Sequence, residues 1–145
     1  MLNFSHTKII AIGKIKKQWI KEGIEMYLKR LPELKVIEIK DSTQTKEEYM
    51  LNEIIKKNHT LVTLNDKGQS FSSTQLANKL LDCQSQNIAF AIGGATGFSP
   101  TLNNSANWQL SLSSLTFPHE IARLLLIEQL YRAKTIADGG PYHKQ

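Results

Sequence analysis

Residues 88–97 read Ile-Ala-Phe-Ala-Ile-Gly-Gly-Ala-Thr-Gly, and this stretch decides the fold. Its five consecutive apolar residues predict a short strand that is buried on both faces. Gly93, Gly94 and Gly97 follow, where the backbone can turn sharply and expose its N–H groups. Such a segment is either a structural turn or a ligand loop. Because ligands of open α/β sheets bind outside the carboxyl ends of strands, we expect a ligand here.

The whole chain has the composition of a globular protein. Its 145 residues, 41% of them hydrophobic, are enough for one domain over residues 1–145. The net charge of +5 permits an anionic partner such as RNA. The single cysteine, Cys83, excludes an internal disulfide and a cysteine-based zinc site, and we expect no metal. No apolar run is long enough to span a membrane, so we expect a cytoplasmic protein.

Strand-like and helix-like patterns alternate along the chain. The predicted strands are residues 8–12, 35–39, 60–64, 88–92 and 108–112. The predicted helices are residues 18–31, 45–57, 72–85 and 118–134, with capping-box patterns at Thr45/Glu48 and Ser72/Gln75. Residues 65–68 are predicted to form a turn or loop, and a polar, Asn-rich segment follows Pro100. This alternation predicts an α/β fold with a mostly parallel sheet flanked by helices.

The last predicted helix, residues 118–134, is apolar around most of its circumference. A helix of that kind is buried on more than one side. It either lies at the centre of one subunit or meets a second copy, and we favour a two-fold dimer. Residues 136–145 are predicted to be non-helical, and a mobile end is the plain interpretation.

Several segments are more specific together than any one alone. They are Gly-Gly-Ala-Thr-Gly-Phe at 93–98, Leu-Ser-Leu-Ser-Ser-Leu-Thr-Phe-Pro-His at 110–119, Ile-Glu-Gln-Leu-Tyr-Arg-Ala at 127–133 and Pro-Tyr-His-Lys at 141–144. In this order they closely resemble the RlmH family of ribosomal large-subunit pseudouridine N3-methyltransferases, within the SPOUT methyltransferases. The resemblance covers essentially the whole chain and is strongest after residue 88.

The resemblance implies a fold and an activity that composition alone does not. It implies a SPOUT-type parallel sheet with a C-terminal trefoil knot, a rare exception to unknotted topology. It further implies a homodimer that packs through its terminal helices. The implied activity is transfer of a methyl group from S-adenosyl-L-methionine to N3 of a pseudouridine in 23S ribosomal RNA within the assembled ribosome.

The resemblance also implies the cofactor site, which by motif comprises Leu64, Gly93, Leu112, Ser113, Ser114, Leu115, Thr116 and Phe117. The apolar members would form the walls of a slot, and the hydroxyl groups and backbone amides would make the polar contacts. Gly93 would permit close approach of the backbone. One departure is Thr96, where the family often has a residue with a carboxylate or an amide, as in Glu-Gly or Asn-Gly.

Methylation of a ring nitrogen requires that its proton be removed, so a general base is expected. His143 and His119 are the candidates, because imidazole titrates near neutral pH. We favour His143, with its neighbour Tyr142, since the family motif places this end of the chain near the active site. His119 could instead cap or orient the last helix.

Basic residues could contact RNA phosphates. The candidates are Lys14, Lys16, Lys17, Arg123, Arg132 and Lys134, although some could be ordinary surface charges or form ion pairs such as Glu128–Arg132. Two other functions stay open. One is a nucleotide-binding protein that uses residues 93–97 as a phosphate loop, although the loop lacks the expected lysine and spacing. The other is an RNA-binding or ribosome-assembly factor without catalysis.

Overall fold

A computed structural model describes residues 1–55 and 58–144 of the chain. Five strands form one sheet in the order β2-β1-β4-β3-β5, and every pair of neighbours is parallel. The strands are β1 (Thr7–Ile12), β2 (Lys35–Ile39), β3 (His59–Ser70), β4 (Asn87–Ile92) and β5 (Trp108–Ser111). The helices are α1 (Gln18–Leu28), α2 (Gln44–Ile54), α3 (Ser73–Cys83), α4 (Pro100–Ser105) and α5 (His119–Asp138). The predicted parallel α/β sheet flanked by helices is therefore confirmed.

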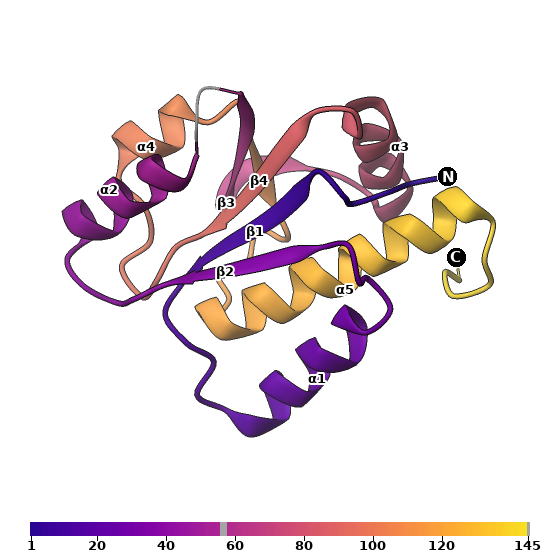
Figure 1. Cartoon of the computed structure of the whole chain (residues 1–145), viewed down its shortest axis with the longest axis horizontal. Coiled ribbons are helices and arrows are strands. Elements are labelled where there is room, and N and C mark those ends of the chain that lie inside the picture. The colour runs from indigo at the N-terminus through magenta and orange to yellow at the C-terminus, as the bar shows by residue number, and fades with distance from the viewer. Residues whose placement is uncertain (56–57, 145) are drawn as a thin grey trace.

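The helices cover both faces of the sheet (Figure 1). One apolar cluster joins α1, α3 and α5 to one face, and a second joins α2 and α4 to the other. Strand β4 shows why its sequence has no polar alternation. Ile88, Phe90 and Ile92 point into the first cluster, whereas Ala89 and Ala91 point into the second. The strand is buried on both faces, as its apolar run predicts.

Helix α5 lies between α1 and α3 on the same face of the sheet. Leu126, Ile127 and Leu130 are completely buried there, and residues 119–137 are all at least half-buried within the single chain. The neighbours α1 and α3 thus account for much of the apolar circumference that the sequence shows. The position of α5 agrees with the alternative interpretation, in which this helix lies at the centre of one subunit. Pairing of two copies through α5 stays a prediction.

The ends of the predicted helices differ from the structure. Helix α1 ends at Leu28 and α3 at Cys83, before the predicted residues 31 and 85. Helix α5 continues to Asp138, so the prediction that residues 136–138 are non-helical was wrong. Gly139, at φ +76°, ends it in the left-handed conformation that favours glycine. In α2 the N-cap is Thr43, whose side chain accepts from the N–H of Lys46, so the predicted Thr45 capping box was wrong. The predicted end of that helix at Lys57 lies outside the described residues.

Two segments that were not predicted as helix or strand have regular structure. Residues 65–68 belong to β3, but they bulge out of the sheet, because pairing with β5 jumps from Leu64–Leu110 to Gln69–Leu110. The Asn-rich segment forms the short helix α4, whose N-cap Ser99 accepts from the N–H of Leu102. The capping box of Ser72 and Gln75 at the start of α3 is confirmed. The trefoil knot stays a prediction.

Candidate functional site

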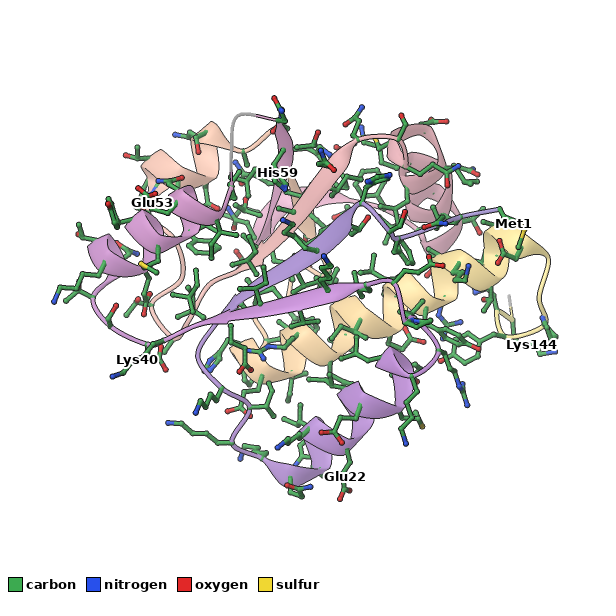
Figure 2. All side chains as sticks on the ribbon, in the orientation of Figure 1. Met1, Glu22, Lys40, Glu53, His59 and Lys144 are labelled. Atoms are coloured by element: carbon green, nitrogen blue, oxygen red, sulfur yellow. The ribbon has the colours of Figure 1, made fainter. Side chains whose placement is uncertain are left out.

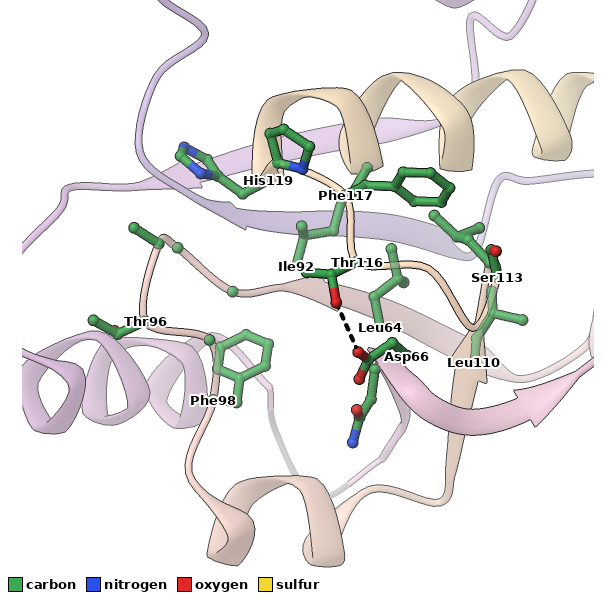
Figure 3. A pocket seen from close by; sticks show the side chains of 18 of the residues that line it. Leu64, Asp66, Ile92, Thr96, Phe98, Leu110, Ser113, Thr116, Phe117 and His119 are labelled. Carbon is green, nitrogen blue, oxygen red and sulfur yellow. Dashed lines mark hydrogen bonds between the residues drawn. The ribbon is translucent and has the colours of Figure 1, made fainter.

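A cavity of about 730 Å³ lies outside the carboxyl ends of β3, β4 and β5 (Figure 3). The glycine-rich loop, residues 93–99, forms one side of the cavity, and residues 112–118, before α5, form another. This is the edge at which open α/β sheets bind ligands. Its volume is within the usual range for a small-molecule site.

The glycine-rich loop folds tightly on itself. The N–H of Gly97 donates to the carbonyl of Gly94 at 2.9 Å, and Gly97 has a φ of +68°. A Cβ atom on Gly93 would lie 3.0 Å from the backbone of Gly97, so a side chain there would disturb the turn. A Cβ on Gly97 would meet nothing within 4 Å. The loop is thus closed on one side and open on the other.

Helix α2 holds the glycine-rich loop from outside the cavity. The side-chain amide of Gln44 donates to the carbonyl of Gly97 at 3.1 Å. Glu48 accepts from both the backbone N–H and the hydroxyl of Ser99, at 2.7 and 2.6 Å. These bonds fix the loop at two places, so its conformation depends on α2 as well as on its glycines.

The loop before α5 is held by hydroxyl groups. The Ser111 hydroxyl lies 3.1 Å from the carbonyl oxygen of Asp66 and 2.9 Å from that of Ser113, and its single proton is shared between these two acceptors. The Ser113 hydroxyl accepts from the N–H of Leu115, and the Thr116 hydroxyl donates to the carboxylate of Asp66 at 3.1 Å. Residues of β3 and of this loop are therefore tied together across the mouth of the cavity.

The cavity brings together most of the residues predicted to bind the cofactor. Seven of the eight line it, and Ser114 does not; the seven are Leu64, Gly93, Leu112, Ser113, Leu115, Thr116 and Phe117. Sequence reasoning missed the lining residues Asn65, Asp66, Phe98 and Asn103. Asp66 was hidden in the predicted turn, and Asn103 lies on the unpredicted helix α4. Phe98 directly follows the glycines and could have been included on that ground.

The predicted catalytic residues Tyr142 and His143 are not at this cavity within the chain. They belong to the segment that follows the C-terminal end of α5 and contains Lys144, which is labelled in Figure 2. The cavity adjoins the other end of α5, where His119 is among its lining residues. The 20 residues of α5 separate the two ends by about 30 Å at 1.5 Å per residue.

The C-terminal segment packs on the protein. The Tyr142 hydroxyl donates to Glu128 at 2.7 Å and lies 3.0 Å from the hydroxyl of Tyr27. Burial, followed by these two hydrogen bonds, raises the pKa of Tyr142 well above its usual range, so the phenol stays protonated. His143 Nδ1 lies 3.2 Å from Arg132, which also pairs with Glu128. The interpretation of residues 142 and 143 as a mobile end was therefore wrong for this arrangement.

A buried carboxylate joins the start of α5 to the loop after β1. Glu120 accepts from the backbone N–H groups of Lys16 and Lys17, at 3.0 and 3.2 Å. Burial opposes ionisation of Glu120, but the two N–H groups and the positive charges of His119 and Lys17 outweigh it and lower its pKa. Glu120 thus fixes the loop that carries the exposed residues Lys14, Lys16 and Lys17.

Three of the basic residues proposed for RNA contacts have partners within the chain. Arg123 is 3% exposed and bonds to Glu38 and to the carbonyl of Gly13, so the prediction that it contacts RNA was wrong. Arg132 pairs with Glu128, as the alternative interpretation had it. Lys134 bonds to the carbonyl of Leu2 and to Asp138.

Within residues 1–55 and 58–144, no group of three or more His, Cys, Asp or Glu side chains could hold a metal ion. In the same residues, no helix is long and apolar enough to cross a membrane.

The chain matches known proteins over its full length. Residues 6–143 match the family model described as "Predicted SPOUT methyltransferase". The chain is 74% identical to the ribosomal RNA large subunit methyltransferase H of Prochlorococcus marinus (strain NATL2A), over all of both chains. It is 47% identical to the protein of the same name from Parasynechococcus marenigrum (strain WH8102), over 99% of both.

A solved structure shares the fold. The structure of a probable methylase family protein from Haemophilus influenzae Rd KW20 matches with a TM-score of 0.56 at 12% identity, covering all of this chain and 72% of that one.

Proposed function

Because the chain belongs to the SPOUT methyltransferases, and among them to the family of the ribosomal RNA large subunit methyltransferase H proteins, we propose that it methylates 23S ribosomal RNA. The methyl donor is S-adenosyl-L-methionine and the acceptor is N3 of a pseudouridine. The observation that carries the proposal is the cavity at the carboxyl edge of the sheet, which gathers seven of the eight residues implied for the donor.

The cavity fits the methyl donor in size and in chemistry. Leu64, Leu112, Leu115 and Phe117 provide apolar walls for the adenosine part. The open side of Gly97 leaves the backbone of the loop accessible to a ligand. When bound, S-adenosyl-L-methionine supplies a methyl group on a positively charged sulfur. The residues of the cavity would hold that methyl group in line with the target nitrogen, which is a matter of positioning.

The lining residues favour this donor over a nucleotide phosphate. Among those that the structure describes, none is a lysine or an arginine, and Asp66 is acidic. A phosphate loop would place a cation, not a carboxylate, beside the ligand. Isothermal titration calorimetry tests this directly: we expect binding of S-adenosyl-L-methionine and none of ATP or NAD. Binding of ATP or NAD alone would contradict the proposal.

We propose that the general base, His143, acts in the cavity of a second copy. His143 contacts Arg132, which lies 13 residues along α5 from His119, about 20 Å at 1.5 Å per residue. This separation from its own cavity supports an arrangement of two copies in which each C-terminal segment faces the other's cavity. The α1 helix beside α5 exposes Trp19 and Met26, at 60% and 46%, and these would be covered in a homodimer. Tyr142, held protonated, would act as a hydrogen-bond donor beside His143.

The arrangement in two copies has a direct test. A His143→Ala protomer keeps its cavity, and a Gly93→Val protomer keeps its C-terminal segment. If the base acts across the dimer, co-expressed protomers of the two kinds form one complete site, and activity returns to a substantial fraction of wild type. If mixtures stay as inactive as each variant alone, the base acts within one chain.

His119 is the alternative base. It lines the cavity of its own chain, and its side chain makes no hydrogen bond to any residue that the structure describes, so the interpretation as a helix cap has no support. The two candidates separate in a pH profile of methyl transfer. A general base makes the rate rise with pH near neutrality. If this rise disappears in His119→Ala but not in His143→Ala, the base is His119.

The RNA would approach the cavity from the edge that carries Lys14, Lys16 and Lys17, all exposed. Lys40, which follows β2 and is visible in Figure 2, lies on the same edge. Such lysines contact phosphates without reading sequence, so recognition would depend on the shape of the assembled ribosome. A ribosomal substrate implies action in the cytoplasm. A non-catalytic assembly factor would bind ribosomes without transferring a methyl group.

A further inference from the structure

Asp66 is the only carboxylate among the described residues that line the cavity. His119 is the only other ionisable side chain among the described residues that line it. The remaining walls are apolar, glycine or neutral polar groups. Any preference of this cavity for a charged ligand over a neutral one must therefore depend strongly on Asp66.

Asp66 lies in the bulge of β3, and hydrogen bonds at Asp66 itself and at its two neighbours, Asn65 and Lys67, fix its position. The hydroxyl of Ser111, a residue that is 5% exposed, donates to the backbone carbonyl of Asp66 at 3.1 Å. The side chain of Asn65 accepts from the N–H of Lys67 at 3.1 Å and donates to Gln109 at 2.8 Å. Because the backbone is fixed at these places, the Asp66 carboxylate has a defined position at the mouth.

The carboxylate is only partly engaged by the protein. Its Oδ2 accepts from the Thr116 hydroxyl at 3.1 Å, and Figure 3 shows the two side chains pointing toward one another over the cavity. Its Oδ1 has no hydrogen-bond partner in residues 1–55 and 58–144. Asp66 is exposed at the rim, so this oxygen can accept a contact from a ligand without first losing one to the protein.

We propose that Asp66 recognises the positive charge of the methyl donor. This inference rests on the proposed function and names a binding residue that the motif comparison does not include. S-adenosyl-L-methionine carries a sulfonium and an ammonium group. When the methyl group leaves, the electron pair of the broken bond stays on sulfur, which becomes a neutral thioether. A carboxylate beside these groups therefore binds the donor, and beside the sulfonium it also disfavours the spent product.

The competing interpretation is that Asp66 only holds Thr116 and closes the mouth. The two differ in which ligands they affect. Recognition of charge concerns only ligands that carry it, whereas a distorted mouth weakens every adenosine-containing ligand alike.

Calorimetry of Asp66→Asn with three ligands separates these interpretations. The ligands are S-adenosyl-L-methionine, S-adenosylhomocysteine, which keeps only the ammonium, and 5′-methylthioadenosine, which has neither cation. We expect Asp66→Asn to bind S-adenosyl-L-methionine about fivefold more weakly, the effect of roughly one exposed charge pair. Binding of 5′-methylthioadenosine should stay unchanged. The matched control is Asp82→Asn on α3, an exposed aspartate that should behave as wild type.

Binding of S-adenosylhomocysteine, the reaction product, shows which cation of the donor Asp66 contacts. A loss confined to S-adenosyl-L-methionine places Asp66 at the sulfonium, and an equal loss for S-adenosylhomocysteine places it at the ammonium. If Asp66→Asn loses affinity equally for all three ligands, or for none, the inference is overturned. The proposed function still stands in that case, because the wild-type protein binds S-adenosyl-L-methionine. Wild-type protein that binds none of the three contradicts the proposed function itself.

Discussion

Glu48 on α2 accepts two hydrogen bonds from Ser99, one from its backbone N–H at 2.7 Å and one from its hydroxyl at 2.6 Å. Ser99 ends the glycine-rich loop and caps α4. One carboxylate therefore connects α2, the loop and α4. Since α2 and α4 lie on the face opposite α5, the cavity depends on contacts from both sides of the sheet.

Removing this carboxylate should weaken donor binding from outside the cavity. We expect Glu48→Ala to lower the affinity for S-adenosyl-L-methionine several-fold and to cost about 1–3 kcal/mol of stability, because two donors lose a charged acceptor. Glu48→Gln, which keeps one acceptor oxygen, should be intermediate. Calorimetry and urea denaturation measure the two effects. Glu53→Gln, on the exposed side of the same helix (Figure 2), is the control. Unchanged binding in Glu48→Ala would mean that the loop holds its conformation without α2.

The buried carboxylate at the start of α5 predicts a pH dependence of stability. The pKa of Glu120 is lowered in the folded protein, so its contribution is present above the unfolded value of about 4.3 and is lost as pH falls through the lowered value. Glu120→Gln should cost about 1–2 kcal/mol at pH 7, where the N–H groups of Lys16 and Lys17 lose a charged acceptor.

Urea denaturation at a series of pH values checks the Glu120 prediction. The difference between wild type and Glu120→Gln should shrink as pH falls below about 4. Exposed Glu25 on α1 supplies the control substitution, Glu25→Gln, for which no such difference is expected. A difference that is constant from pH 7 to pH 3 would show that Glu120 acts through packing and not through its charge.

The lysines after β1 should affect the RNA and not the methyl donor. Combined substitution of Lys14, Lys16 and Lys17 by glutamine should raise the KM for ribosomes and reduce the salt dependence of binding by about two to three ion equivalents. Affinity for S-adenosyl-L-methionine should be unchanged, since none of the three lines the cavity. Lys29 and Lys35, exposed near the amino-terminal edge of the sheet, supply a matched control pair. Equal effects of both sets would indicate non-specific charge.

The sheet could be predicted well because its signal is local. Strands β1, β2 and β4 were located within one residue. The buried strands β1 and β4 carry runs of apolar residues, and the edge strand β2 alternates loosely between apolar and charged residues. The short helix α4 escaped prediction because six polar-rich residues carry no periodic pattern. Its cap, Ser99 followed by Pro100, was the available signal. Gly139 likewise marked the true end of α5.

Part of the site could be predicted from the sequence, and there are physical reasons why the other residues were missed. The resemblance supplied seven lining residues, because their motifs are contiguous in sequence. Asp66 was missed because Asn-Asp-Lys-Gly is typical of a turn, and the same turn chemistry occurs here within a bulged strand. The position of His143 relative to a cavity cannot be obtained from one chain if the cavity belongs to another. Sequence periodicity shows that a helix is apolar, but not which molecule covers it.

The central claim, that the chain methylates N3 of a pseudouridine in 23S ribosomal RNA, is tested most directly by methyl transfer in vitro. Ribosomes that lack the modification would be incubated with the protein and S-adenosyl-L-methionine, and the digested 23S RNA would be analysed by mass spectrometry. We predict one N3-methylpseudouridine per RNA, absent when the methyl donor is omitted. RNA that gains no methyl group, or gains it on another base, from protein that binds the donor would contradict the claim.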